Sequence, residues 1–391
     1  MKQRIYVSPS ANRKSGYPNR YFVKLKENLA DYFDVLDSGN KPCLMQGLAL
    51  LRHSFRADIF LLSFVETIAF HKFAFIQYLM VRLSFAVMRL RRGRIVFIFH
   101  NPRPHKGENW MSRSLTRLQL TRACLVVSHS RGTAAFAREL LSEYGCSPDK
   151  VRYFCHPVVP LSDSFPAATP LSRSVSGSGL SGSSAGCSEV GDDVLIWGNI
   201  LPYKGVLEFV SSPAVCSAGL KVRIVGRCKD ASLAADIERA VALCNAGGSS
   251  VSPSCQECSV DGFQHGSVSP DAASSHRTSI VFENRAADFE ELAHLVRSSR
   301  HVLFPYLPGS VSSSGVLMDT LSMGGNPVGP DIGAFADLAS EDVCSVYASE
   351  SEMIRILKSD IRVSPETVRG FISRNSWHSF AKFFADFFSC R

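Results

Sequence analysis

A lysine and two glycines follow a short apolar run in the second half of the chain, in the stretch DVLIWGNILPYKGVLEFV at residues 193–210. The run 194–197 predicts a buried strand that ends at Gly198, and the apolar spacing after Lys204 predicts a helix. Backbone N–H groups and the helix dipole at such a turn favour an anion. A lysine there adds a full charge, so the pattern predicts a phosphate site; an ordinary turn with a solvated lysine is the alternative.

A second turn of this kind lies at residues 312–315, where three serines and Gly315 precede an expected helix at 316–323. Small hydroxyl residues and a glycine at a helix start form either a simple N-terminal cap or an anion site. Two such turns in one α/β half suggest a diphosphate, or one phosphate held from two sides. Their convergence favours a nucleotide more strongly than either motif alone.

Polar side chains also follow a strand in the first half, where HNPRPH at residues 100–105 comes after the expected strand 94–99. Ligands of doubly wound sheets bind at the carboxyl ends of strands, which makes His100, Asn101 and His105 candidates to hydrogen-bond a polar substrate. A capped structural loop is the alternative. No carboxylate or third histidine follows at a metal-ligand spacing, so no metal site is expected.

Alternating strands and helices must position these turns. A strand at 4–7, a loop, a helix from residue 22 and a strand at 33–36 form the start of a doubly wound unit. The loop 8–18, which contains Gly16, is then either a binding loop or a plain surface loop. The second half repeats the alternation, so the expected class is α/β with two Rossmann-like, doubly wound domains.

A serine- and glycine-rich segment at residues 161–191 predicts a flexible linker between these domains. The length of 391 residues also favours two domains. We therefore expect one domain at 1–160, a second at 192–365, and an aromatic helix at 366–391 that packs at the domain junction.

Charge is divided between the two halves. Residues 1–160 hold 25 Lys and Arg against 10 Asp and Glu, a net +15, and the remainder has a net −7. The basic half should seek a polyanion, and no nucleic-acid-binding motif is recognisable in it. The apolar region 64–88, followed by an arginine cluster, is either an interfacial membrane helix or a core helix with a solvated end. We expect peripheral contact with an anionic membrane.

Twelve cysteines are scattered without the spacing of a secreted disulfide scaffold, and no signal peptide is visible. These features predict reduced thiols and a cytoplasmic protein, in contact with the inner face of the membrane. Cys255 and Cys258 form a CxxC pair with Cys244 and His265 in range, a weak zinc pattern for which free thiols are the favoured interpretation.

Beyond these patterns, GNILPYKG and the FPY…SSSGVLMDTLSMGGNPV block resemble the nucleotide-sugar domain of retaining GT-B glycosyltransferases of the group one, or family 4, type. HNPRPH followed by VVSHS is similar to the acceptor domain of that family. The resemblance implies two Rossmann-like domains facing a cleft. It also implies metal-independent, retaining transfer of a sugar from a nucleotide diphosphate sugar to a glycan or lipid-linked acceptor, in polysaccharide biosynthesis. The nucleotide sugar is a substrate, and no cofactor is implied.

Carried over by position, the resemblance gives Lys204 and the imidazole of His105 or His100 catalytic roles. Lys204 would bind the donor diphosphate, and a histidine would face the transferred sugar. Gly198 and Asn199 would lie beside the diphosphate, and many family members have arginine in place of Asn199. The loop that matches the family's pyrophosphate loop holds Ser313, Ser314, Gly315 and Val316.

The family's two glutamates, eight positions apart, are replaced here by Ser312 and Thr320. Asp319 lies one position from the second of them and, with Thr320, is a candidate for substrate contact. The alternative function is that of a catalytically degenerate protein, which binds a nucleotide sugar or serves as a scaffold.

Overall fold

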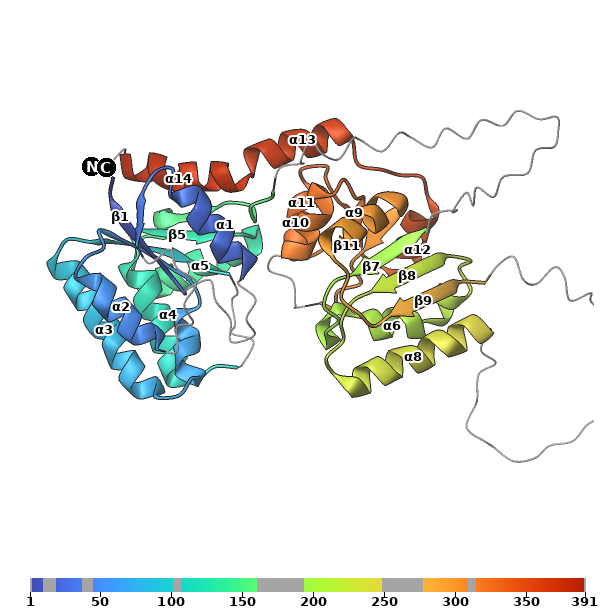
Figure 1. The fold of residues 1–391 in the computed structure, drawn as a ribbon, viewed down its shortest axis with the longest axis horizontal. Helices are drawn as coiled ribbons and strands as arrows, with labels where there is room; N and C mark the ends of the chain where they lie inside the picture. The colour runs from blue at the N-terminus through green and yellow to red at the C-terminus, as the bar shows by residue number, and fades with distance from the viewer. Residues whose placement is uncertain are drawn as a thin grey trace, which may run out of the picture.

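A computed structural model of the chain describes residues 2–9, 19–36, 45–100, 107–159, 193–247, 277–308 and 314–389. It contains two lobes, each built on a six-stranded parallel sheet with helices packed on it (Figure 1). The predicted α/β class is therefore confirmed. The expected linker at 161–191 lies outside the described residues.

The first sheet has the order β2-β1-β3-β4-β5-β6. Its central strands are buried along their whole length, which explains why they appear in the sequence as short, continuous apolar runs. The strands are β1 (Arg4–Ser8), β2 (Asp34–Leu36), β3 (Ile59–Leu62), β4 (Arg94–Ile98), β5 (Leu125–Ser128) and β6 (Val151–Tyr153).

The second sheet has the order β9-β8-β7-β10-β11-β12, which is the strand order of the Rossmann fold. The direction of winding reverses between β7 and β10, and a ligand is expected at that point. The strands are β7 (Val194–Trp197), β8 (Lys221–Val225), β9 (Ser279–Glu283), β10 (His301–Leu303), β11 (Pro327–Pro330) and β12 (Ser345–Tyr347).

Several helices of the first lobe begin at polar caps and bury one apolar face. In α1, the Asn19 side chain accepts a hydrogen bond from the N–H of Tyr21, and Phe22, Leu25 and Leu29 are buried at the predicted spacing. The helices are α1 (Arg20–Leu29), α2 (Gln46–Ser54), α3 (Ala74–Leu90), α4 (Trp110–Arg122) and α5 (Arg131–Glu143), with 3-10 turns η1 (Val65–Phe70) and η2 (Pro148–Lys150).

Most helices of the second lobe are likewise capped by a polar side chain and bury an apolar face. The predicted apolar face after Lys204 is present, since Val206, Phe209 and Val210 of α6 are buried. The elements are η3 (Pro202–Lys204), α6 (Val206–Ser211), α7 (Pro213–Cys216), α8 (Ala231–Ala246), α9 (Phe289–Ser298), α10 (Gly315–Ser322), α11 (Gly333–Ala339) and α12 (Glu350–Lys358).

The aromatic C-terminal segment forms two helices, α13 (Pro365–Arg374) and α14 (Trp377–Ser389), with a break at Asn375 and Ser376. The chain crosses between the lobes here, because α13 packs in the core of the second lobe and α14 on the sheet of the first (Figure 1). A backbone hydrogen bond of 2.9 Å from Val158 N to Asn375 O joins this crossing to the segment after β6.

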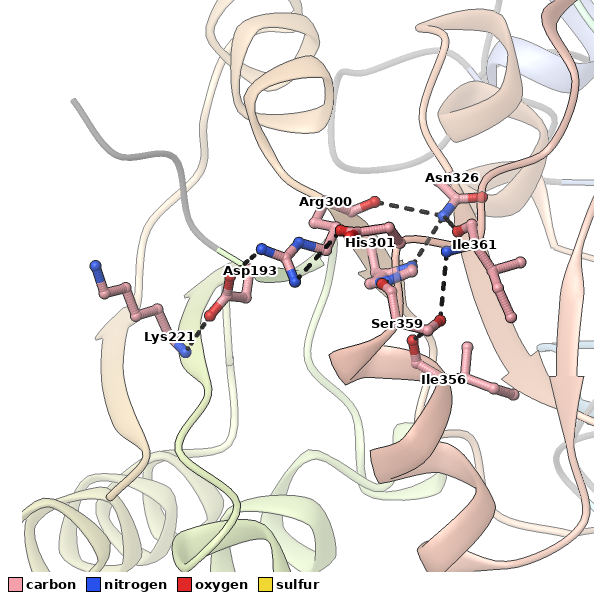
Figure 2. A network of polar contacts seen from close by, with 9 residues as sticks. Asp193, Lys221, Arg300, His301, Asn326, Ile356, Ser359 and Ile361 are labelled. Atoms are coloured by element: carbon pink, nitrogen blue, oxygen red, sulfur yellow. Dashed lines mark hydrogen bonds and ion pairs between the residues drawn. The ribbon is translucent and has the colours of Figure 1, made fainter. Parts of the chain in front are cut away.

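A polar network closes the amino ends of the strands in the second lobe (Figure 2). The Arg300 guanidinium lies 3.3 Å from the Asp193 carboxylate, and Asn326 Nδ2 donates to His301 Nδ1 at 2.9 Å. His301 Nε2 in turn donates to the carbonyl oxygen of Ser359 at 3.0 Å. These contacts join the segments that precede β7, β10 and β11 to the end of α12, so this end of the sheet stabilises the lobe.

A disulfide joins Cys216 and Cys244, whose Cα atoms lie 5.2 Å apart because α7 packs beside α8. The expectation of free thiols is therefore wrong at these two positions, while Cys255, Cys258 and His265 lie outside the described residues. Within the described part of the chain, none of the helices has both the length and the apolar character needed to cross a bilayer.

Candidate functional site

A small hollow opens at the carboxyl ends of β7 and β10, where the strand order reverses. Its lining includes Gly198 and Asn199 after β7, and Pro305 and Tyr306 after β10. A backbone hydrogen bond of 3.0 Å from Leu307 N to Tyr203 O ties the two loops together. The structure thus forms a hollow at the edge of the sheet where doubly wound folds bind ligands.

Two glycines let the backbone make this turn. Gly205 has φ +65°, and a Cβ added to it would lie 1.9 Å from the carbonyl oxygen of Pro305. Gly198 has φ +104°, and its added Cβ would lie 3.4 Å from the Val316 side chain and 3.5 Å from Lys204 Nζ. These values place Lys204 Nζ within about 7 Å of the Val316 side chain, in the first turn of α10, since both lie within 3.5 Å of one point.

Lys204 lines the hollow with only 7% of its surface exposed. Its Nζ lies 5.4 Å from the centroid of the Tyr306 ring, and no carboxylate among the described residues forms an ion pair with it. Burial lowers the pKa of Lys204 to about 8. A buried ammonium without a counter-ion is costly, so this position favours a bound anion.

The first turn of α10 borders a second cavity, which lies between the lobes. The Ser314 hydroxyl accepts a hydrogen bond from Leu317 N at 3.4 Å, so Ser314 is an N-terminal cap, one of the two predicted roles. Gly315 is exposed and borders the space between the lobes. The amides of Gly315 and Val316 have no acceptor within the described residues, and they carry the positive end of the helix dipole.

Thr320 does not face the cleft. It is fully buried, where its hydroxyl accepts from the Trp197 indole N–H at 3.0 Å and donates to the carbonyl oxygen of Val316 at 2.9 Å. Its role is to join β7 to α10. Asp319, its neighbour, lines a cavity between the lobes, where burial raises the pKa of its carboxyl group.

The first lobe contributes an aromatic cluster at the carboxyl ends of β4, β5 and β6. The ring centroid of Tyr21, at the start of α1, lies 5.2 to 5.6 Å from the ring centroids of His100, His129 and His156. It lies 5.0 Å from that of Trp377. Because His129 Nδ1 donates to the Phe154 carbonyl oxygen at 2.8 Å, its Nε2 accepts from the Tyr21 hydroxyl at 2.6 Å. We call Tyr21, His100, His129 and His156 the histidine cluster.

All three imidazoles in the histidine cluster are neutral at physiological pH. Burial lowers the pKa of His100 to about 3 and that of His156 to about 4, and it lowers the pKa of His129 well below 6.5. His100 stacks on Phe64 at 4.5 Å, and its Nε2 is buried without a hydrogen-bond partner among the described residues. Within those same residues, no group of histidines, cysteines and carboxylates is arranged to hold a metal ion.

A cavity of about 300 Å³ lies between the lobes. Tyr21, His156 and Trp377 line it from one side, and Gly315 and Asp319 line it from the other. Two members of the histidine cluster, Tyr21 and His156, therefore border one cavity with Gly315 at the α10 N-terminus. The lobes also touch elsewhere, since Arg131 N donates to the Asp337 carboxylate at 2.7 Å.

Four predicted site residues, Gly16, Asn101, His105 and Ser313, lie outside the described residues. Sequence reasoning did not select Tyr21, His129 or His156 as site residues. A signal for the two histidines was present, because VVSHS and YFCHP each place a histidine after a predicted strand. Tyr21 gave no such signal, since it appears only as one more aromatic residue at a helix start.

Solved structures of other proteins have the same two-lobed architecture. No family model matches the chain, and no curated protein matches its sequence. HepE of Anabaena in complex with UDP-glucose is similar in structure, with a TM-score of 0.58 at 9% identity and 100% of both chains covered. A trehalose-6-phosphate synthase studied for glycosyl transfer with retention gives 0.56 at 11% identity, covering 99% of this chain and 93% of the other. AviGT4, a glycosyltransferase of avilamycin A biosynthesis, gives 0.53 at 13%, covering 99% and 96%. The chain thus has the GT-B fold of two Rossmann-like domains.

Proposed function

We propose that this protein is a glycosyltransferase that moves a sugar from a nucleoside diphosphate sugar to a hydroxyl group of a glycan or lipid-linked acceptor, with retention of configuration. The observation that carries the proposal is the buried Lys204 ammonium beside the first turn of α10, with no carboxylate partner among the described residues. A diphosphate supplies the missing negative charge. Structural neighbours that bind UDP-glucose or transfer sugars with retention support the same donor class.

The chemistry follows from where charge develops. As the sugar leaves, negative charge grows on the diphosphate, and the Lys204 ammonium and the amides of Gly315 and Val316 would stabilise it. The neutral His100 imidazole would hydrogen-bond the transferred sugar from the first lobe through its buried Nε2, which has no partner among the described residues. Attack from the leaving-group side, with a donor phosphate oxygen as base, would give retention without a protein nucleophile.

The test is a panel of nucleoside diphosphate sugars, screened by thermal shift and then assayed for donor hydrolysis and transfer. Loss of one well-placed charge contact typically lowers kcat by a factor of about 100 to 1,000, and we expect Lys204→Ala to do so. Unchanged activity in this variant would overturn the mechanism. Donor binding without turnover in the wild-type protein would instead support the degenerate alternative, which the buried Thr320 in place of a glutamate favours.

We also propose that the first lobe contacts an anionic membrane through the outer face of α3. Large apolar side chains there are about half exposed or more, and arginines lie among them: Phe75, Ile76, Leu79, Arg82, Leu83, Arg89 and Leu90. Exposed apolar surface with basic residues is typical of an interfacial helix. Sedimentation with vesicles containing phosphatidylglycerol should bring down the wild-type protein and leave a Leu79→Glu, Leu83→Glu variant in solution. Equal sedimentation of both would contradict this contact. The cytoplasmic location stays a prediction from the sequence.

A further inference from the structure

A single lysine leaves the proposed diphosphate site short of positive charge. The hollow at the end of β7 contains Lys204 as its cation, and Asn199, which also lines it, is neutral. Negative charge on a diphosphate increases as the sugar leaves, so a second cation near the α10 N-terminus would stabilise the same step. The structure brings one there from the opposite lobe.

Arg20 is the first residue of α1, and its side chain crosses from the first lobe to the second. Its Nη1 lies 3.6 Å from the Asp319 carboxylate, and its Cζ lies 5.2 Å from the centroid of the Phe289 ring. Asp319 belongs to α10 and Phe289 to α9, so both partners are on the second lobe. Arg20, Asp319 and Gly315 all line the cavity between the lobes.

We infer that Arg20 binds the donor diphosphate from the first lobe, and that a phosphate displaces the weakly held Asp319 carboxylate from its guanidinium when the donor arrives. The inference rests on the proposed function. Asp319 lies four residues after Gly315 on α10, so it shares a helix face with the amide-bearing first turn, roughly 6 Å away. To leave Asp319 and reach a phosphate at that turn, the Arg20 guanidinium would therefore move by about the length of one helical turn.

The Arg20 contact with Asp319 suits an exchangeable partner. The Arg20 side chain is 61% exposed, and 3.6 Å is long for a charge-assisted hydrogen bond, so the pair is weak. A planar guanidinium can make two parallel hydrogen bonds to a phosphate, which gives the anion an advantage over this carboxylate contact. Arg20 and Lys204 belong to different lobes. If both bind one diphosphate, donor binding is coupled to lobe closure.

The experiment measures binding of UDP, GDP and ADP, and of the matching monophosphates, by calorimetry. For the nucleotide that binds tightest, Arg20→Ala should weaken diphosphate binding at least tenfold, with Arg20→Lys between it and the wild type. Monophosphate binding should change less than threefold. If the contact between Arg20 and Asp319 only positioned the lobes, its loss would weaken binding of both ligands equally. The control is Arg239→Ala, an exposed arginine on α8 that also pairs with an aspartate, at 3.0 Å, and it should bind within twofold of wild type.

Asp319→Asn gives an independent readout, since removal of the competing carboxylate should leave diphosphate binding equal or tighter. Weaker binding in that variant would contradict the role given to Asp319. If Lys204→Ala abolishes diphosphate binding and Arg20→Ala binds like the control, the inference about Arg20 fails and the proposed function stands. If none of the three diphosphates binds the wild-type protein, the proposed function itself fails.

Discussion

The histidine cluster predicts that the protein loses stability steeply in mild acid. Each of its three imidazoles has a pKa below the ordinary value of about 6.5, through burial. Below pH 6.5 the unfolded chain therefore binds more protons than the folded chain does. The stability is fully present above pH 6.5 and is lost as pH falls toward the folded values, which are about 3 for His100 and about 4 for His156.

The magnitude follows from the size of these shifts. At pH 5.5, one unit below the unfolded pKa, each imidazole that stays neutral costs about 1.4 kcal/mol relative to neutral pH. His129 and His100 together give about 3 kcal/mol, and His156, which borders the cavity, raises the sum to about 4 kcal/mol if it also stays neutral. Losses of this size are a large part of the stability of a typical domain, which is about 5 to 15 kcal/mol.

The assay is urea unfolding at pH 7.5 and pH 5.5, with the free energy of unfolding extrapolated to water. His100→Phe retains the stacking on Phe64 and removes one titrating group, so the drop between the two pH values should shrink by about 1.4 kcal/mol. The matched control is His294→Phe on the exposed face of α9. A total drop below about 1 kcal/mol, or the same drop in His100→Phe as in wild type, would refute the reasoning.

Three further predictions concern the second lobe. Thr320→Val leaves the buried Trp197 indole N–H without its acceptor and should lower the free energy of unfolding by about 1 to 3 kcal/mol in urea melts, with Thr320→Ser close to wild type. Gly205→Ala should destabilise by about 1 kcal/mol or more and weaken nucleotide binding, because its Cβ would meet the Pro305 carbonyl oxygen in a backbone conformation that favours glycine. Donor affinity, followed by calorimetry from pH 7 to 9.5, should fall as Lys204 loses its proton near pH 8, and a flat profile would contradict that assignment.

The sequence was informative where local pattern and burial agree. Parallel strands covered on both faces must be apolar throughout, so VLIW at β7 and LVVS at β5 could be located from composition alone. The lysine and the glycine after β7 could be selected because a helix start has the same electrostatic character in every fold.

Features that depend on the packing of distant segments could not be predicted from the sequence. The aromatic spacing of α14 predicts a buried face, but it does not show that the face packs on the sheet of the first lobe. The histidine cluster collects residues from three strands and a helix, and Arg20 meets Asp319 only because the lobes face each other. The bond between Cys216 and Cys244 depends likewise on the packing of α7 beside α8.

The central claim is that Lys204 and the α10 N-terminus hold one diphosphate between them. The most direct measurement is a crystal structure with a bound nucleoside diphosphate. We predict diphosphate oxygens within hydrogen-bond distance, roughly 2.7–3.2 Å, of both Lys204 Nζ and the Gly315 amide nitrogen. A nucleotide bound away from the end of β7, or one that contacts neither group, would contradict the account.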